Sequence, residues 1–148
     1  MILIDLAIGL PTMLACLILQ VSVTFWVVKY YLRLPARRLS NSGWFAGIWP
    51  LMVVMVVMMA GNFLQMAIWG AVFFFLGEFD SVQAAFYHSA VNFSTLGYGD
   101  VVMSDDWKLL GPLEAANGVL MFAMTSAALM AVLQHMIKVQ LVVGEKKQ

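Results

Sequence analysis

The segment best suited to chemistry is Ser94-Thr95-Leu96-Gly97-Tyr98-Gly99-Asp100, in which two glycines flank a single residue. Glycine adopts positive φ without steric cost, so this spacing suits a backbone that alternates in hand from one residue to the next. Such a strand can point successive carbonyl oxygens to one side. Rings of carbonyl oxygens around an axis can replace the water shell of a cation. The residue types therefore indicate ion coordination by the backbone.

Apolar stretches on both sides of this segment are long enough to cross a membrane. A hydrocarbon core of ~30 Å requires a helix of ~20 apolar residues. Three such stretches are present, at about residues 6–28, 48–76 and 113–137. A fourth helix of roughly 14 residues is expected within 79–94, too short to span and of the length typical of a re-entrant segment. Asp80 or Ser81 is a plausible N-cap for it.

The composition independently indicates a membrane protein. The chain has 148 residues, of which 63% are hydrophobic and 11% charged, whereas a soluble domain is about 45–50% apolar and about 25% charged. The formal net charge of zero argues against a nucleic-acid partner. No nucleophile–base pair, metal-ligand cluster or phosphate loop is visible, so we expect neither an enzyme, nor a cofactor, nor a soluble small-molecule substrate.

The basic residues predict the orientation, because seven of the eight lie on one side of the three stretches. They are Lys29, Arg33, Arg37 and Arg38 after the first stretch, and Lys138, Lys146 and Lys147 after the third. Lys108 is the exception. The positive-inside rule places these segments in the cytoplasm, with the N-terminus and residues 77–112 outside. The first stretch lacks the basic start of a signal peptide and is expected to be retained. We expect a plasma membrane, and from the short chain without processing signals a bacterial one.

The segment from Thr95 to Asp100 resembles the potassium-channel signature Thr-Val-Gly-Tyr-Gly-Asp, with Leu96 in place of valine. The resemblance extends over about residues 48–140, in the order outer helix, pore helix, filter and inner helix. It implies a potassium-binding filter whose lining carbonyls belong to Thr95, Leu96, Gly97 and Tyr98, with the Thr95 hydroxyl and with Gly99 completing the filter. The family builds its pore from four such strands, so the resemblance implies a homotetramer in membrane lipid, with K⁺ as the permeant ion.

Three other interpretations remain open from the residues alone. The glycines could form an ordinary turn between helices. The chain could be a weakly selective cation channel on the same scaffold, although Tyr98 favours potassium because non-selective relatives tend to replace this tyrosine or the residues after it. It could also be a non-conducting membrane subunit that keeps the pore fold.

Residues around the filter invite further comparison with the family. Tyr87 occupies the position of a tryptophan that supports the filter by bonding to the following aspartate, here Asp100; the alternative is an interfacial aromatic. His88 could titrate between pH 5 and 8 near the outer mouth, or simply be packed. Val91 stands where one branch of the family has a glutamate behind the filter, so we expect this chain to lack that particular carboxylate.

The third stretch is expected to line the pore with one face. The resemblance places Ala123, Ser126, Met130 and Gln134 toward the axis, and their spacing suits one helical face. Glu114 is expected near the membrane interface, in a structural hydrogen bond. The hinge glycine of the family has no clear match, since Phe122 aligns with it and Gly118 lies one turn earlier.

We therefore predict an all-α membrane protein with three transmembrane helices, and with a re-entrant pore helix and selectivity filter between the second and third, assembled as a tetramer. The predicted divisions are an N-terminal transmembrane helix (1–28), a basic cytoplasmic linker (29–47), the pore domain (48–140) and a short cytoplasmic tail (141–148). The N-terminal helix is expected to pad the periphery of the tetramer. Asn62 and Gln65 are expected to join helices rather than bind ions.

Overall fold

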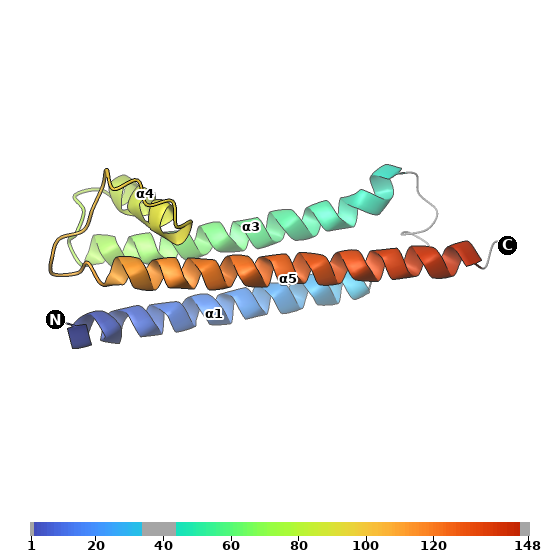
Figure 1. The fold of residues 1–148 in the computed structure, drawn as a ribbon, viewed down its shortest axis with the longest axis horizontal. Helices are drawn as coiled ribbons and strands as arrows, with labels where there is room; N and C mark the ends of the chain where they lie inside the picture. The colour runs from blue at the N-terminus through green and yellow to red at the C-terminus, as the bar shows by residue number, and fades with distance from the viewer. Residues whose placement is uncertain (1, 34–43, 146–148) are drawn as a thin grey trace.

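The computed structural model describes residues 2–33 and 44–145, and these form four helices and no strand (Figure 1). The helices are α1 (Ile2–Leu32), α3 (Trp44–Phe75), α4 (Val82–Phe93) and α5 (Leu110–Glu145). Three of them contain stretches long and apolar enough to cross a membrane: Ile2–Leu32, Ile48–Phe75 and Leu110–Val139. The predicted all-α fold with three candidate spans and a short fourth helix is confirmed.

The long helices lie side by side, with α1 and α5 parallel and α3 antiparallel to both (Figure 1). The short α4 packs against one end of α3 and α5, and the N-terminus of α1 lies at that same end. We call this end, which also holds residues 94–109, the filter end. The opposite end holds Lys29 and Arg33 and is called the basic end.

All three long helices extend beyond the hydrophobic stretches that predicted them, and α3 begins at Trp44 rather than near residue 48. α1 ends at Leu32 rather than near residue 28, and α5 continues through Glu145, so residues 141–145 of the predicted tail are helical. Hydropathy marks only the part of a helix that lies in hydrocarbon, and the backbone can stay helical past it. Arg37, Arg38, Lys146 and Lys147 lie outside the described residues.

α1 packs into the groove between α3 and α5 through one narrow stripe. Its buried residues are Asp5, Gly9, Cys16, Gln20, Val27 and Tyr31. This spacing repeats every 11 residues, close to the period of a straight helix, so the stripe stays on one side along the length of α1. A Cβ on Gly9 would lie 2.6 Å from Leu113 Cδ1, so the glycine allows α1 to approach α5 closely.

A polar network joins α1, α3 and α5 in mid-span. Gln20 Nε2 donates to Thr125 Oγ1 (2.9 Å) and to the Met121 carbonyl (3.3 Å). Gln65 Nε2 donates to Gln20 Oε1 (2.7 Å), and Asn62 Nδ2 lies 3.4 Å from Thr125 Oγ1. The expectation that Asn62 and Gln65 join helices is therefore confirmed. The N-terminal helix does more than pad a surface, because it supplies the central side chain of this network.

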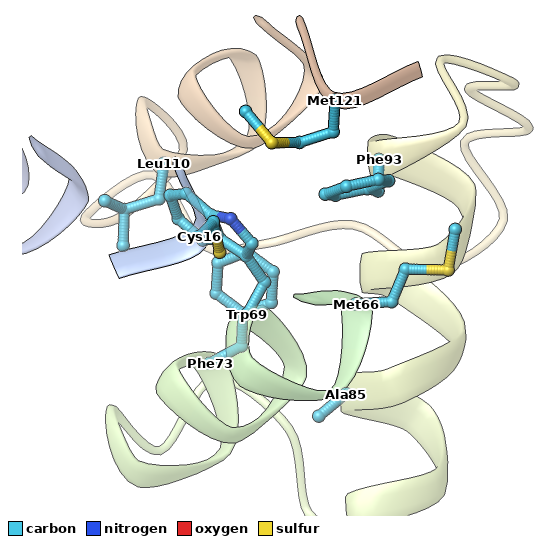
Figure 2. Close-up of a cluster of buried hydrophobic side chains, with 8 residues drawn as sticks. All are labelled: Cys16, Met66, Trp69, Phe73, Ala85, Phe93, Leu110 and Met121. Carbon is cyan, nitrogen blue, oxygen red and sulfur yellow. The ribbon is translucent and has the colours of Figure 1, made fainter. Parts of the chain in front are cut away.

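Apolar contacts form two clusters along the bundle. The first lies at the filter end, draws on all four helices, and contains Cys16, Met66, Trp69, Phe73, Ala85, Phe93, Leu110 and Met121 (Figure 2). The second lies toward the basic end and contains Val27, Tyr31, Val54, Met58, Ala128 and Val132.

Two glycines allow α4 to sit deeply between its neighbours. A Cβ on Gly70 of α3 would lie 3.1 Å from Phe86 Cα, and a Cβ on Gly118 of α5 would overlap the Phe93 carbonyl group. Gly118 therefore has a packing role, which is to let the inner helix touch the C-terminal end of α4. The first cluster and these two contacts together fix α4 within the filter end.

Candidate ion-binding filter

The short helix α4 delivers the chain to the filter. Ser81 is its N-cap, with extended backbone and a side chain that accepts a hydrogen bond from Ala84 N (3.1 Å). After the helix ends at Phe93, Thr95 N donates to the Asn92 carbonyl (2.8 Å) and Leu96 N to the Val91 carbonyl (2.9 Å). These bonds use carbonyls that a helix end leaves without partners. The start of the filter is thereby tied to the end of α4.

In the candidate filter, residues with positive φ alternate with residues without it. Thr95, Gly97 and Gly99 have φ values of 59°, 62° and 74°, while Leu96 and Tyr98 between them do not have positive φ. For the two glycines this conformation is unstrained. Thr95 is the only non-glycine residue with positive φ in the part of the chain that the structure describes, and such a position costs ~1–3 kcal/mol. The alternation expected from the glycine spacing is present and begins at Thr95, two residues before the first of the two glycines.

The side chains between the positive-φ residues turn away from their own chain. Leu96 is 55% exposed and Tyr98 67% exposed. Tyr98 and Leu96 are two residues apart and have large apolar surfaces, so we would expect them to pack against protein rather than to stay uncovered. In a single chain, the side chains of Leu96 and Tyr98 are therefore left largely uncovered.

Tyr87 is hydrogen-bonded to the residue that follows the candidate filter. Its hydroxyl donates a 2.7 Å hydrogen bond to Asp100 Oδ2, and Asp100 Oδ1 accepts from Val101 N (3.1 Å). The bond from Tyr87 lowers the pKa of Asp100, and the same bond raises the pKa of Tyr87. The contact suggested by the sequence is thus present, and it joins α4 to the segment just after the filter.

His88 makes a second hydrogen bond between α4 and the segment just after the candidate filter. Its Nδ1 lies 2.7 Å from the Val101 carbonyl oxygen, which can only accept, so Nδ1 carries the hydrogen. Its Nε2 lies 2.8 Å from the Asn92 amide nitrogen, so Nε2 accepts. Desolvation by burial lowers the pKa of His88, and the bond to Val101 opposes this. Between Phe73 and Phe79, the ring is packed and neutral, which favours the structural interpretation over a pH sensor.

A carboxyl group from a different helix lies buried behind α4. It belongs to Glu114 of α5, which is fully buried, and its Oε1 is hydrogen-bonded to the hydroxyl of Ser89. The expected structural hydrogen bond is present, and Glu114 is fully buried because α4 and α1 cover this turn of α5. Ser89 was not anticipated as its partner, since the two residues are 25 positions apart.

A further hydrogen-bonded contact at the filter end was not predicted from the sequence. Ser104 donates both its backbone N–H and its hydroxyl to the Glu78 carboxylate, each at 2.7 Å. This closes the segment after the filter against the turn that precedes α4. A glutamate in an exposed loop carries no signal in the sequence that would reveal such a partner.

The predicted pore-lining residues share one exposed face of α5. They are Ala123, Ser126, Met130 and Gln134, while Met121, Ala128 and Val132 on the other side are buried. A cavity of about 420 Å³ lies between the filter and the start of α5, with Thr95, Gly97 and Ala115 among its lining residues.

The three spans, the helix α4 and the tied segment after it define a multi-pass α-helical membrane protein of the pore-loop kind. A protein-family model described as "Ion channel" matches residues 62–135, half of the chain. The match begins in α3, includes α4 and the filter, and ends in α5. The chain belongs to this ion-channel family, which is not a family of enzymes. Comparison with curated proteins and with solved structures found no match.

Proposed function

We propose that this chain is a subunit of a homotetrameric potassium channel that conducts K⁺ passively. Four copies of Thr95–Gly99 would surround one axis, and the carbonyl oxygens of Thr95, Leu96, Gly97 and Tyr98, with the Thr95 hydroxyl, would replace the water around each ion. The observation that carries this proposal is the alternation of positive φ at Thr95, Gly97 and Gly99, directly after a short helix buried between two spans.

Two exposed features support assembly around an axis. Leu96 and Tyr98 are uncovered in a single chain, and a neighbouring copy would supply the wall behind them. The exposed face of α5 that includes Ser126 and Met130 would then line the path from the filter to the basic end. One strand cannot surround an ion, so the site is incomplete without further copies.

The position of α4 supports selection for cations. The C-terminal end of a helix carries a partial negative charge, and α4 ends two residues before Thr95. In a tetramer, four such ends would point toward the path just beneath the filter. The conducted ion is then a cation, and the filter distinguishes among cations.

We further propose that the filter end faces outward and the basic end faces the cytoplasm of a bacterial cell. Lys29 and Arg33 at the basic end of α1 support this orientation under the positive-inside rule. Lys108 at the filter end is paired with Asp105 at 2.9 Å, so it adds little net positive charge there.

The decisive experiment is cation flux through liposomes containing the purified protein, under a K⁺ gradient and after replacement of K⁺ by Na⁺. Gly97→Ala tests the filter, and Gly77→Ala is its matched control. Both glycines have positive φ (62° and 76°) and open space around an added Cβ, so both substitutions impose similar backbone strain. Only Gly97 lies in the filter.

Flux that prefers K⁺, persists in Gly77→Ala and disappears in Gly97→Ala is the expected result. Equal K⁺ and Na⁺ flux with the same response to the two variants would instead identify a weakly selective cation channel. Absence of flux from an assembled tetramer, together with absence of K⁺-dependent thermal stabilisation, would identify a non-conducting subunit. The second measurement separates an empty filter from a closed gate.

A further inference from the structure

A buried hydroxyl behind the filter connects three helices. Ser89 of α4 is fully buried, and its Oγ lies 2.7 Å from the Met66 carbonyl oxygen of α3. The same Oγ is hydrogen-bonded to Glu114 Oε1 of α5. Ser89 lies six residues before Thr95, so these contacts hold the part of α4 from which the filter emerges.

The hydrogens available to these three groups determine which of them donates. A serine hydroxyl has one hydrogen, a backbone carbonyl only accepts, and an ionised carboxylate only accepts. If Glu114 were ionised, the single hydroxyl hydrogen of Ser89 would have to serve both the Met66 carbonyl and the Glu114 carboxylate. One of these two oxygens would then face a lone pair of Ser89 Oγ without a hydrogen between them. If Glu114 is protonated, it donates to Ser89 Oγ and Ser89 donates to the Met66 carbonyl. Only the protonated form satisfies both contacts.

The surroundings of Glu114 also favour a neutral group. Within residues 2–33 and 44–145, the one ion pair joins Asp105 to Lys108, so no cation neutralises Glu114. Its second oxygen, Oε2, makes no hydrogen bond of good geometry there, and the uncharged amide of Asn92 on α4 is the polar group of that helix nearest to the carboxyl besides Ser89. The polar groups of α1, α3 and α5 close to this site belong to Cys16, Trp69 and Asn117, which are uncharged. Burial of an unpaired charge is far more costly than burial of a neutral, hydrogen-bonded acid.

We propose that Glu114 is a neutral carboxylic acid that donates its proton to Ser89 and so fixes α4, and the filter behind it, to α3 and α5. Glu114 is a positioning residue, because it acts on the filter through Ser89. Its effect on ion selection rests on the proposed function, whereas its protonation state does not.

The protonation state is measured by infrared difference spectroscopy of the full-length assembly in liposomes at neutral pH. We expect the spectrum of the unchanged protein minus that of Glu114→Gln to contain the carbonyl stretch of a carboxylic acid. A second difference, against Ser89→Ala, should show the same band shifted in frequency, because its acceptor is gone. Difference spectra with only carboxylate bands would overturn the proposal.

The positioning role is measured by the ratio of K⁺ to Na⁺ flux. Glu114→Gln keeps a neutral donor for Ser89 and should retain the ratio, whereas Glu114→Ala and Ser89→Ala should each lower it by roughly tenfold, as the loss of one hydrogen bond predicts. The double variant Ser89→Ala/Glu114→Ala should match Ser89→Ala, because loss of the Ser89 hydroxyl already removes its contact with Glu114. Thr125→Val, which disrupts the mid-span network instead, should lower thermal stability without changing the ratio.

An unchanged ratio in Glu114→Ala and Ser89→Ala would overturn the positioning role. A ratio that falls equally in Glu114→Gln and Glu114→Ala would overturn the neutral-donor mechanism, because the charge would then be what matters. If the unchanged protein gave no flux, the proposed channel function would fail, and the infrared band would still decide the state of Glu114.

Discussion

The bundle can be divided into a filter half, next to the filter end, and a basic half, next to the basic end. The two halves are stabilised by different forces. In the filter half, buried polar side chains such as His88, Ser89 and Glu114 form hydrogen bonds between elements. The cluster toward the basic end consists of apolar side chains and Tyr31, whose hydroxyl has no hydrogen-bond partner among the described residues. Tyr31 instead contacts the ring of His135 edge-on, with centroids 5.8 Å apart.

This difference indicates which end is rigid and which end can rearrange. Hydrogen bonds weaken steeply when their geometry changes, whereas apolar burial is non-directional. The filter half is therefore expected to keep one geometry. The basic half can let α5 shift against α1 and α3 with little loss, so we expect opening and closing of the pore to occur there.

The largest expected effect comes from breaking the filter half at Gly118. In Gly118→Ala the new Cβ would overlap the Phe93 carbonyl, so α5 and α4 must move apart. We expect the free energy of unfolding to fall by about 2–3 kcal/mol, as for overpacked cores, with loss of flux. Denaturant unfolding in detergent measures the first and the liposome assay the second.

Gly61→Ala is the control for Gly118→Ala. A Cβ at Gly61 of α3 would make ordinary contacts, 3.8 Å from Gln20 Oε1 and Val23, and alanine favours a helix by up to ~1 kcal/mol over glycine. We expect unchanged or slightly higher stability. Similar losses in both variants would show that the contact with Phe93 is not what makes Gly118 necessary.

A smaller effect is expected from removal of the mid-span network. Gln20→Leu deletes the donor to Thr125 and the acceptor of Gln65, and interhelical hydrogen bonds in membranes average ~0.6 kcal/mol each. The free energy of unfolding should fall by about 1–2 kcal/mol. Thr24→Val removes only a 3.9 Å contact to Met58 Sδ and should cost far less. Equal losses would show that the hydrogen bonds of Gln20 contribute no more than one weak sulfur contact.

The basic half should tolerate a change of shape at constant volume. Met58 is fully buried in that cluster, and Met58→Leu is expected to lower the free energy of unfolding by less than about 1.5 kcal/mol. Thermal unfolding compared with the unchanged protein checks this. A loss larger than that of Gln20→Leu would mean that the basic half also depends on specific contacts.

The smallest effect on stability is expected at Tyr87. Tyr87→Phe removes the bond to Asp100 at the exposed edge, so assembly should persist while flux declines faster during sustained conduction and the K⁺ preference weakens. The pKa of Asp100 should rise in this variant, because the bond that lowers it is lost. An NMR titration of labelled aspartate measures that shift, and an unchanged pKa would contradict the role of Tyr87.

The same bond should not respond to pH in the physiological range. The pKa of Asp100 is depressed below its usual value of 3.8, so the stabilisation from the bond is present above that pH and is lost as pH falls through the folded pKa. The pKa of Tyr87 is raised above 10.0, so its proton is retained up to that pH. Any change in flux between pH 5 and 8 must therefore arise elsewhere.

The sequence predicted what depends on neighbours along the chain. Hydropathy located the three spans, Ser81 was one of two N-caps considered, and the glycine spacing predicted the alternating backbone at Gly97 and Gly99. These features follow from local sterics, hydrogen bonding and partition into lipid. They account for most of the fold and for the shape of the candidate filter.

The sequence did not predict what depends on contacts between distant segments. Burial of Glu114 requires that α4 cover that turn of α5, and its bond to Ser89 spans 25 positions. The need for glycine at position 118 arises only where α5 meets Phe93. Neither helix periodicity nor composition contains this information, because both describe one helix at a time.

The bond between Gln20 and Thr125 has a consequence for the order in which the protein is made. The two residues are 105 positions apart, and synthesis at ~5–20 residues per second separates their emergence from the ribosome by about 5–20 s. During that interval the first helix has entered the membrane with its amide unmatched by Thr125. The last helix to arrive therefore supplies the hydrogen-bond acceptor for the amide of the first.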